Sequence, residues 1–595
     1  MIDLEEITMK RLTIIVMILM VYCLSLCACT SKNPAKAEMQ AMVGINQEIT
    51  GSYDEALAAV CHNGTFVGEA DGAVLAFKGI PYAAPPVGDL RWKDPVPATD
   101  GDGVYEAKYF GKSPIQTEWF SEVGSYYLQG EDCLTLHVWT NLSGPTEGKT
   151  VMVFFHGGSY GWGATSDPIY DGHDLVDKYP DLVLVTVAYR TGIMGFIDFS
   201  AVPGGEAFST SGNLGLLDQI CALQWVQNNI EAFGGDPGNV TIFGESAGAG
   251  SVSLIPLVDG TEGLFQRIIA ESGSLSLTSG RDECQNLTQM LLDSSGCSTM
   301  DELMALSEEK LMELNEGLND YNNFPERDGI VLSEDLYGAW EDDALTDIDI
   351  LVGTNSDECR YWVLEMGYYA PIFPKAFVYK ISLPFMYENN RRVMSGEEKD
   401  LVDAFMDRQS GKKIWKLTEF YNELLFRIPA VTQAERHKGT SYNYYWTMSG
   451  ADEMLGACHA IELAYVFRNP QVDIYTGSLY NEELADTVQD MWVNFARNGD
   501  PSTEEYTWEP YTVDSRKTMV LGEEIGMVED LKSEQRKWIE PLLHHYFNGC
   551  YSQLDYNVPQ LYRIIAQVAA ALVLLALVIF ILCRMIKRHK KNLSL

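Results

Sequence analysis

The residues with the clearest potential for chemistry surround Ser246. The sequence Gly244-Glu245-Ser246-Ala247-Gly248 follows the apolar run 240–243 and precedes small residues that suit a helix. A Gly-x-Ser-x-Gly pattern between a strand and a helix forms a sharp turn that holds its serine in a strained, exposed position. The helix that follows directs its N–H groups at developing negative charge. The motif therefore predicts that Ser246 is a nucleophile.

A serine nucleophile requires a base, and the base requires an orienting carboxylate; the chain order expected for this turn is Ser, acid, His. The histidines that follow Ser246 are His437, His459, His544, His545 and His589. His459 ends the small-residue loop 456–459 and is the best candidate for the base. His437 lies in a charged stretch typical of a surface, His589 lies in a basic tail, and the adjacent pair ends a helix-like run.

The acid is expected on a loop after a strand. Residues 348–352 form a short apolar run that predicts a strand, and Asp357 and Glu358 follow it in a polar loop. Both carboxylates suit the role chemically, so the residues alone leave the two open.

An oxyanion site is predicted on the loop His156-Gly157-Gly158-Ser159, which follows the apolar run 151–155. In this kind of site, backbone N–H groups of an early loop act together with the N–H of the residue after the serine. Small residues in the loop let the backbone approach a substrate carbonyl oxygen.

The surrounding elements predict an α/β class. Runs 151–155, 182–188 and 240–243 are continuously apolar and rich in β-branched residues, as in strands buried on both faces of a parallel sheet. Residues 214–233 have apolar positions at helical spacing, which completes a βαβ unit. Residues 281–345 predict helical excursions that cap a cleft.

The composition is that of a globular protein with an unusual charge. The chain has 595 residues, 46% of them hydrophobic, and a formal net charge of −42. A field of this sign repels nucleic acid and anionic lipid, so we expect no nucleic-acid partner.

Both ends of the chain predict export and a membrane anchor. A basic start at Lys10 and Arg11 precedes an apolar run and Leu26-Cys27-Ala28-Cys29, which is similar to a bacterial lipobox with Cys29 lipidated. Residues 564–583 carry no charge and are long enough to span a bilayer. The basic residues after them favour a cytoplasmic tail, so the acidic body should face outward at the cell membrane, as a single-pass protein of a bacterium.

Five segments then carry a resemblance to a known family, the type-B carboxylesterases, which include cholinesterases, para-nitrobenzyl esterases and the adhesion proteins called neuroligins. The segments are 77–86 with Leu90-Arg91-Trp92, 131–139, 213–219, 233–248 and 492–501. The resemblance covers residues from about Ala59 to Phe547. It implies an α/β-hydrolase fold, in which helices flank a central, mostly parallel sheet, and hydrolysis of small carboxylic esters.

The resemblance also implies a role for each matching residue. Ser246 would be the nucleophile, Glu358 the acid and His459 the base, while Gly158, Ser159 and Ala247 would donate the oxyanion N–H groups. Arg91 and Glu131 would form a structural salt bridge. The family commonly has Gly or Ala where Ser159 stands, but the backbone N–H is kept. No metal and no organic cofactor is expected in the reaction.

The cysteines depart from the family pattern. Cys133 lacks its usual partner, which leaves it unpaired or joined to Cys61, and Cys284 could replace the missing partner of Cys297. Because Cys359 follows the acid and Cys458 precedes the base, we expect a disulfide between them.

The domain organisation expected from the sequence is a leader at 1–29, a linker at 30–56, a carboxylesterase domain at 57–548, a juxtamembrane linker at 549–563, a transmembrane helix at 564–583 and a basic tail at 584–595.

Two alternatives to a carboxylesterase stay open: a lipase or amidase with the same triad, and a surface adhesion protein without catalysis. The natural substrate and the oligomeric state do not follow from the sequence.

Overall fold

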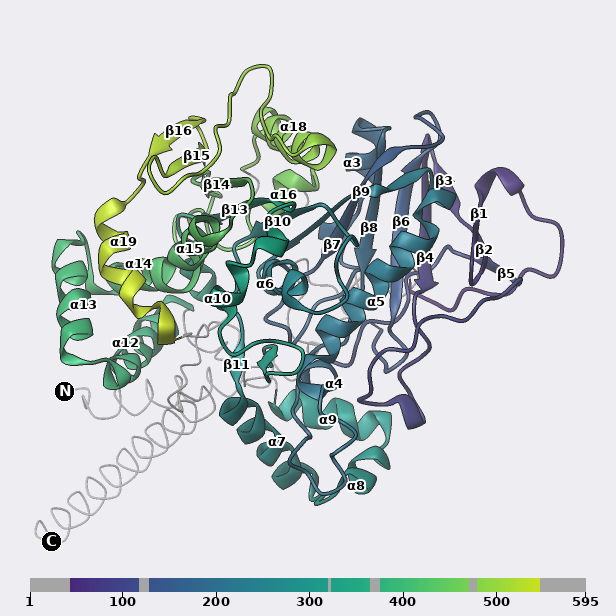
Figure 1. The fold of residues 1–595 in the computed structure, drawn as a ribbon, viewed down its shortest axis with the longest axis horizontal. Helices are drawn as coiled ribbons and strands as arrows, with labels where there is room; N and C mark the ends of the chain where they lie inside the picture. The colour runs from purple at the N-terminus through teal and green to yellow at the C-terminus, as the bar shows by residue number, and fades with distance from the viewer. Residues whose placement is uncertain (1–42, 117–127, 319–322, 364–374, 470–478, 546–595) are drawn as a thin grey trace, which may run out of the picture.

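The fold is described from a computed structural model that covers residues 43–116, 128–318, 323–363, 375–469 and 479–545. It is built around one sheet of eleven strands in the order β16-β15-β14-β13-β10-β9-β7-β8-β6-β4-β3 (Figure 1). From β15 to β8 along this order every pairing is parallel, and the strands at both edges pair antiparallel. The predicted α/β class with a mostly parallel central sheet is confirmed.

The strands of this sheet have the following bounds: β3 Glu69–Asp71, β4 Val74–Pro81, β6 Thr135–Asn141, β7 Lys149–Phe155, β8 Leu182–Val187, β9 Gly235–Glu245, β10 Arg267–Glu271, β13 Asp349–Asn355, β14 Ser441–Trp446, β15 Lys517–Leu521 and β16 Gly526–Glu529. A separate three-stranded sheet contains β1 Ala58–Cys61, β2 Gly64–Val67 and β5 Val104–Glu106, and a two-stranded one contains β11 Ser279–Gly280 and β12 Glu326–Arg327.

The central strands are buried on both faces, as their unbroken apolar runs predict. Every residue of β7 and β8 is buried. Successive side chains of β7 point to opposite faces of the sheet: Val151, Val153 and Phe155 join one hydrophobic core, and Met152 and Phe154 join the other. The sheet therefore separates two cores, each closed by helices.

The α-helices are α3 His173–Lys178, α4 Gly192–Gly195, α5 Leu214–Asn229, α6 Ala247–Leu254, α7 Arg281–Ser295, α8 Met300–Met304, α9 Glu308–Leu318, α10 Leu336–Trp340, α12 Lys375–Val393, α13 Gly396–Arg408, α14 Lys413–Tyr421, α15 Ile428–Arg436, α16 Leu463–Val466, α18 Glu482–Asn498 and α19 Ser533–Ile539. Shorter turns used below are the 3₁₀ helices η5 Ile230–Phe233, η8 Glu358–Tyr361 and η10 Glu540–His545, and the π-helix η9 Asn422–Arg427.

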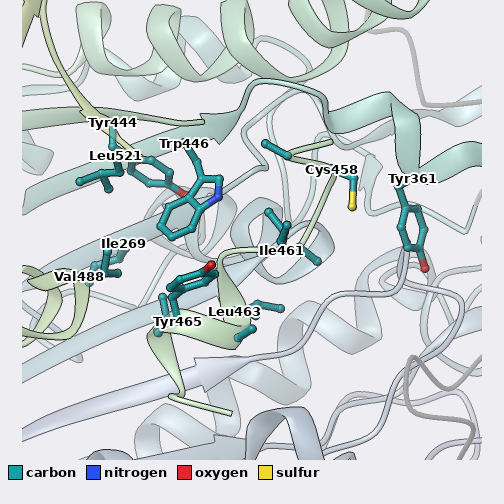
Figure 2. Close-up of a cluster of buried hydrophobic side chains, with 14 of the residues drawn as sticks. Ile269, Tyr361, Tyr444, Trp446, Cys458, Ile461, Leu463, Tyr465, Val488 and Leu521 are labelled. Atoms are coloured by element: carbon teal, nitrogen blue, oxygen red, sulfur yellow. The ribbon is translucent and has the colours of Figure 1, made fainter. Parts of the chain in front are cut away.

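Helices α5 and α18 cover opposite faces of the sheet. The predicted helix at 214–233 is found as α5 followed by η5, and it ends at Gly234 in the left-handed conformation. Its apolar residues belong to the same core as Val151, whereas those of α18 belong to the other. Figure 2 shows part of the second core, where the rings of Trp446 in β14 and Tyr465 in α16 have their centroids 4.8 Å apart.

The helical excursion predicted at 281–345 is present as α7 to α10 (Figure 1).

The salt bridge between Arg91 and Glu131 is confirmed, with two contacts of 2.6 Å between the guanidinium and the carboxylate. The same guanidinium donates to the carbonyl oxygens of Met304, the last residue of α8, and of Leu306, which precedes α9. This buried pair therefore holds the excursion against the body.

The cysteines differ from the expectation. The seven in the described ranges are thiols, so the predicted pairing of Cys359 with Cys458 was wrong, as was that of Cys284 with Cys297. Of the two alternatives left open for Cys133, the structure has the unpaired thiol rather than the pairing with Cys61. Contact between Glu358 and His459 does not require contact between their neighbours, because successive side chains point in different directions.

The predicted leader at 1–29 and transmembrane helix at 564–583 lie outside the described residues, so both stay predictions. Within the described ranges, no helix is both long and apolar enough to cross a bilayer. The predicted linker at 30–56 is described from residue 43 on, where it lies against the body: Val43 bridges to Phe110, and Glu48 bridges to Tyr105.

Candidate active site

Ser246 lies in the turn between β9 and α6, in the strand-turn-helix setting that its motif predicts. Its backbone has φ 57° and ψ −118°, in the left-handed half of conformational space. Its N–H donates to the carbonyl oxygen of Glu271 at 2.8 Å, which ties the turn to the end of β10. A Cβ atom on Gly248 would lie 1.9 Å from the carbonyl oxygen of Phe155, so only glycine permits this close approach to β7.

Glu358 and His459 meet beside this turn. Glu358 begins η8 after β13, and His459 lies in the loop after β14. Nδ1 of His459 donates to Oε2 of Glu358 at 2.6 Å. The other oxygen, Oε1, accepts the N–H of Asn355 at 2.7 Å, which fixes the orientation of the carboxylate.

The structure also distinguishes Asp357 from Glu358, the two candidates for the acid between which the residues alone did not decide. Asp357 pairs with Arg360 at 2.8 Å and accepts the N–H of Ala457 at 3.2 Å, so its contacts stabilise the loop. Only Glu358 of the two contacts the imidazole of His459. The resemblance-based choice of Glu358 therefore agrees with the geometry.

The remaining histidines are accounted for separately. His437 was expected at the surface, but it is buried, and its Nε2 lies 2.7 Å from the carbonyl oxygen of Ile348. Its charged neighbours in sequence point elsewhere, so that expectation was wrong. His544 and His545 gather around Glu398, away from Ser246 in the fold, and His589 lies outside the described residues.

The predicted oxyanion loop lies directly over the serine turn. A Cβ atom on Gly157 would come within 3.0 Å of the Cβ of Ser246 and within 2.9 Å of the carbonyl oxygen of Glu245. This close approach brings Gly158 and Ser159 to the same cavity as Ala247. The three predicted N–H donors are thus brought together around one space.

That cavity also contains Ser246, Glu358 and His459. The rest of its wall is mainly apolar and aromatic: Trp162, Leu277, Phe324, Tyr361, Trp362, Leu425 and Phe426. Such a lining suits the apolar parts of an uncharged substrate, with few polar groups placed for chemistry.

Part of this wall was not foreseen from the sequence. Leu425 and Phe426 come from the π-helix η9, and the Phe426 ring lies 5.0 Å from that of His459 between centroids. The excursion at 281–345, expected to cap the cleft, contributes Phe324. A π-helix inserted between α14 and α15 leaves little periodic signal, although such insertions are frequent at functional sites.

Glu245 is the most important residue of the site whose role the sequence did not predict. Its side chain is buried, and its Oε1 lies 3.1 Å from Nε2 of His459, the atom that faces away from Glu358. Burial alone would lower the pKa of His459, but the charges of Glu245 and Glu358 raise it to about 10. The imidazole therefore lies between two carboxylates, and its protonated form is favoured at neutral pH.

Two further buried glutamates, Glu462 and Glu271, lie near the two carboxylates that contact His459. Glu462 accepts hydrogen bonds from Ser272 and Asn355, and burial followed by the charge of Glu358 raises its pKa to about 7. Glu271 accepts from Trp492 at 2.7 Å, and burial raises its pKa well above the ordinary value. The only feature of the sequence that points to these buried glutamates is the short spacing between His459 and Glu462.

Comparison with known proteins agrees with this geometry. The model of the carboxylesterase family matches residues 59–538. The chain belongs to the carboxylesterase family. A para-nitrobenzyl esterase of Bacillus subtilis is 33% identical over 509 residues, which cover 80% of this chain and 97% of the relative. The cholinesterase of Mus musculus is 30% identical over 497 residues, covering 76% and 80%.

Solved structures give the same result. A thermophilic PNB esterase superimposes with a TM-score of 0.71 at 30% identity, covering 81% of this chain and all of that one. The carboxylesterase of Geobacillus stearothermophilus gives the same TM-score and identity, covering 81% and 99%. The protein is therefore a serine carboxylesterase with the α/β-hydrolase fold.

The position of Glu245 predicts a change in pH dependence. Glu245→Gln removes one negative charge next to Nε2, so the pKa of His459 should fall. The neutral imidazole needed as a base then forms at lower pH, and the rising limb of kcat/KM should move to lower pH by about one unit or more. Profiles of kcat/KM against pH measure this shift.

The matched control is Glu262→Gln, which removes an exposed carboxylate outside the cavity and should leave the limb in place. An unchanged midpoint in Glu245→Gln would mean that Glu245 does not set the protonation of His459.

Proposed function

We propose that the protein hydrolyses small to medium carboxylic esters through an acyl-enzyme on Ser246, with Glu358 and His459 completing the triad. The observation that carries this proposal is the 2.6 Å contact between His459 and Glu358 in the cavity that also contains Ser246. The family supports ester hydrolysis, and the residue roles are inferred from the geometry.

In the first half of the reaction, Nε2 of His459 takes the proton of Ser246 as Oγ bonds to the ester carbonyl carbon. The carbonyl oxygen becomes an oxyanion, which accepts hydrogen bonds from the N–H groups of Gly158, Ser159 and Ala247. Each preset donor of this kind contributes about 3 kcal/mol to transition-state stabilisation. The carbon–oxygen bond to the alcohol then breaks, and the alcohol leaves with the proton from His459.

In the second half, water gives a proton to His459 and attacks the acyl carbon, and Ser246 regains its proton as the acid leaves. Glu358 keeps Nδ1 protonated, so that Nε2 faces the reaction, and stabilises the imidazolium each time it forms. Glu245 also stabilises the imidazolium, so it favours the charged intermediate while opposing the neutral base.

The apolar lining supports an uncharged acyl or alcohol group as the bound part of the substrate. The triad itself does not select between ester, triglyceride and anilide leaving groups. Assays with triglyceride and anilide substrates beside simple esters therefore distinguish the carboxylesterase from the lipase and amidase alternatives.

Hydrolysis of para-nitrophenyl butyrate by the purified protein and by Ser246→Ala tests the triad. Removing the nucleophile should lower kcat by a factor of about 10³ or more, with the folded state retained. Ser251→Ala, a change of another buried serine in the same helix region, is the matched control and should keep most of the activity. Equal rates for the protein and Ser246→Ala would contradict the proposal.

We further propose that the domain faces the outside of a bacterial cell, held by residues 564–583 and by lipidation of Cys29. The support is the uncharged run, the basic residues after it and the lipobox-like sequence. An impermeant protease added to intact cells should release or destroy the esterase activity. Activity that persists until the cells are lysed would contradict an outward-facing domain.

A further inference from the structure

A cluster of three side chains of types that ligate metals lies outside the catalytic cavity. Glu398 is in the first turn of α13, and His544 and His545 end η10. The ligand atoms of these three residues all lie within 4.8 Å of one another. The cluster joins segments that are almost 150 positions apart in sequence, and none of the three residues lines the cavity that contains Ser246.

Two of the three separations between ligand atoms are close to those of a zinc site. Oε1 of Glu398 lies 3.2 Å from Nε2 of His544 and 3.1 Å from Nε2 of His545. A tetrahedral zinc ion with bonds of about 2.0–2.1 Å requires neighbouring ligand atoms to lie roughly 3.3–3.4 Å apart. All three ligand atoms lie within 4.8 Å of one another, so side-chain rotations must bring the two imidazole nitrogens to this spacing when an ion binds.

The orientation of Glu398 is fixed by groups that leave one oxygen for the cluster. Its Oε2 accepts the N–H of Ser395 at 2.6 Å, while the Ser395 hydroxyl accepts the N–H of Glu398. This reciprocal capping box holds the carboxylate at the start of α13 and directs Oε1 at the two histidines.

The ring of His544 is oriented in the same manner. Its Nδ1 lies 2.9 Å from the carbonyl oxygen of Pro541, so Nδ1 carries the proton and donates it there. In the neutral ring, Nε2 then presents a lone pair toward Glu398. A histidine whose other nitrogen donates to a backbone carbonyl is the usual arrangement at protein metal sites.

The exposure of the residues suits a site that an ion can reach. The side chains of Glu398 and His545 are 14% exposed, whereas that of His544 is 63% exposed. An ion can enter from the side of His544, and water can complete its coordination. Two imidazoles and one carboxylate favour zinc over calcium or magnesium, which prefer oxygen ligands throughout.

We propose that Glu398, His544 and His545 bind a zinc ion that fastens α13 to the end of the esterase domain. Helix α13 already packs beside α19 (Figure 1): Phe405 contacts the ring of Trp538 edge-on, and Arg408 lies over the same ring. Zinc adds a bond between these elements close to residue 549, where the predicted juxtamembrane linker begins. The role is structural, and the esterase chemistry does not pass through the ion.

Titration calorimetry of the full chain in detergent, freed of metal by chelation, tests the site with zinc chloride alone. We expect about one tight site per chain, and we expect His545→Ala to weaken it by about 100-fold or more. His544→Ala changes a side chain that is 63% exposed, so the variant should fold as the parent does, and it should weaken zinc binding as well.

The matched control is His173→Ala. His173 is another partly exposed histidine beside carboxylates, with Asp174 at 3.0 Å and Asp71 at 3.7 Å, but it is not part of the cluster. This variant should bind zinc as the parent does. A thermal unfolding series should show that zinc raises Tm for the parent and for His173→Ala but not for the cluster variants.

Zinc affinity that stays within threefold of the parent in both His544→Ala and His545→Ala would overturn the proposal. The same conclusion would follow if the parent bound no zinc, since the cluster would then be only a set of ion pairs between imidazoles and Glu398. Esterase activity that survives metal removal is expected, so the two proposals fail independently.

Discussion

The turn at Ser246 is the constraint on which the rest of the active site depends. The serine backbone adopts a positive φ between β9 and α6, a conformation that most residues avoid. It is held there because its N–H bonds to the end of β10 and because Gly248 lets α6 pack against the backbone of β7. Any side chain at position 248 would collide with the backbone of β7 and force the helix away from the sheet.

The other groups reach the serine through the order of the sheet. The strands β14, β13, β10, β9 and β7 are neighbours, and all run in the same direction. The base follows β14, the acid follows β13, the nucleophile follows β9 and the oxyanion loop follows β7. Because the carboxyl ends of parallel strands share one edge, residues far apart in sequence meet in one cavity. The electrostatics follow from this arrangement, since Glu245 and Glu358 both reach His459.

Much of this could be predicted from the sequence because the signals are local. The Gly-x-Ser-x-Gly turn, the glycine loop after 151–155 and the apolar strands each depend on neighbouring residues. The choice of Glu358 over Asp357 required the family resemblance, since both carboxylates are in the same loop. His437 was misjudged because its sequence neighbours are charged, whereas its burial depends on Ile348 and Trp340, which come from other parts of the chain.

The features that the sequence did not predict depend on packing between segments that are far apart in the chain. The contact of Glu245 with His459 joins the serine turn to a loop more than 200 residues later, and no local pattern signals it. The expected disulfide between Cys359 and Cys458 failed for a related reason, because it assumed that neighbours of contacting residues also make contact. The π-helix wall and the cluster of Glu398 with His544 and His545 likewise form only when distant segments pack together.

The most direct test of this account is to find where a covalent inhibitor attaches. The protein is treated with a fluorophosphonate, digested and analysed by mass spectrometry, beside the variant His459→Ala. Our account predicts one adduct, on the peptide that contains Ser246, and its loss or strong slowing in the variant. An adduct on another serine, or the absence of any adduct on the folded protein, would contradict the assignment of Ser246 as an activated nucleophile.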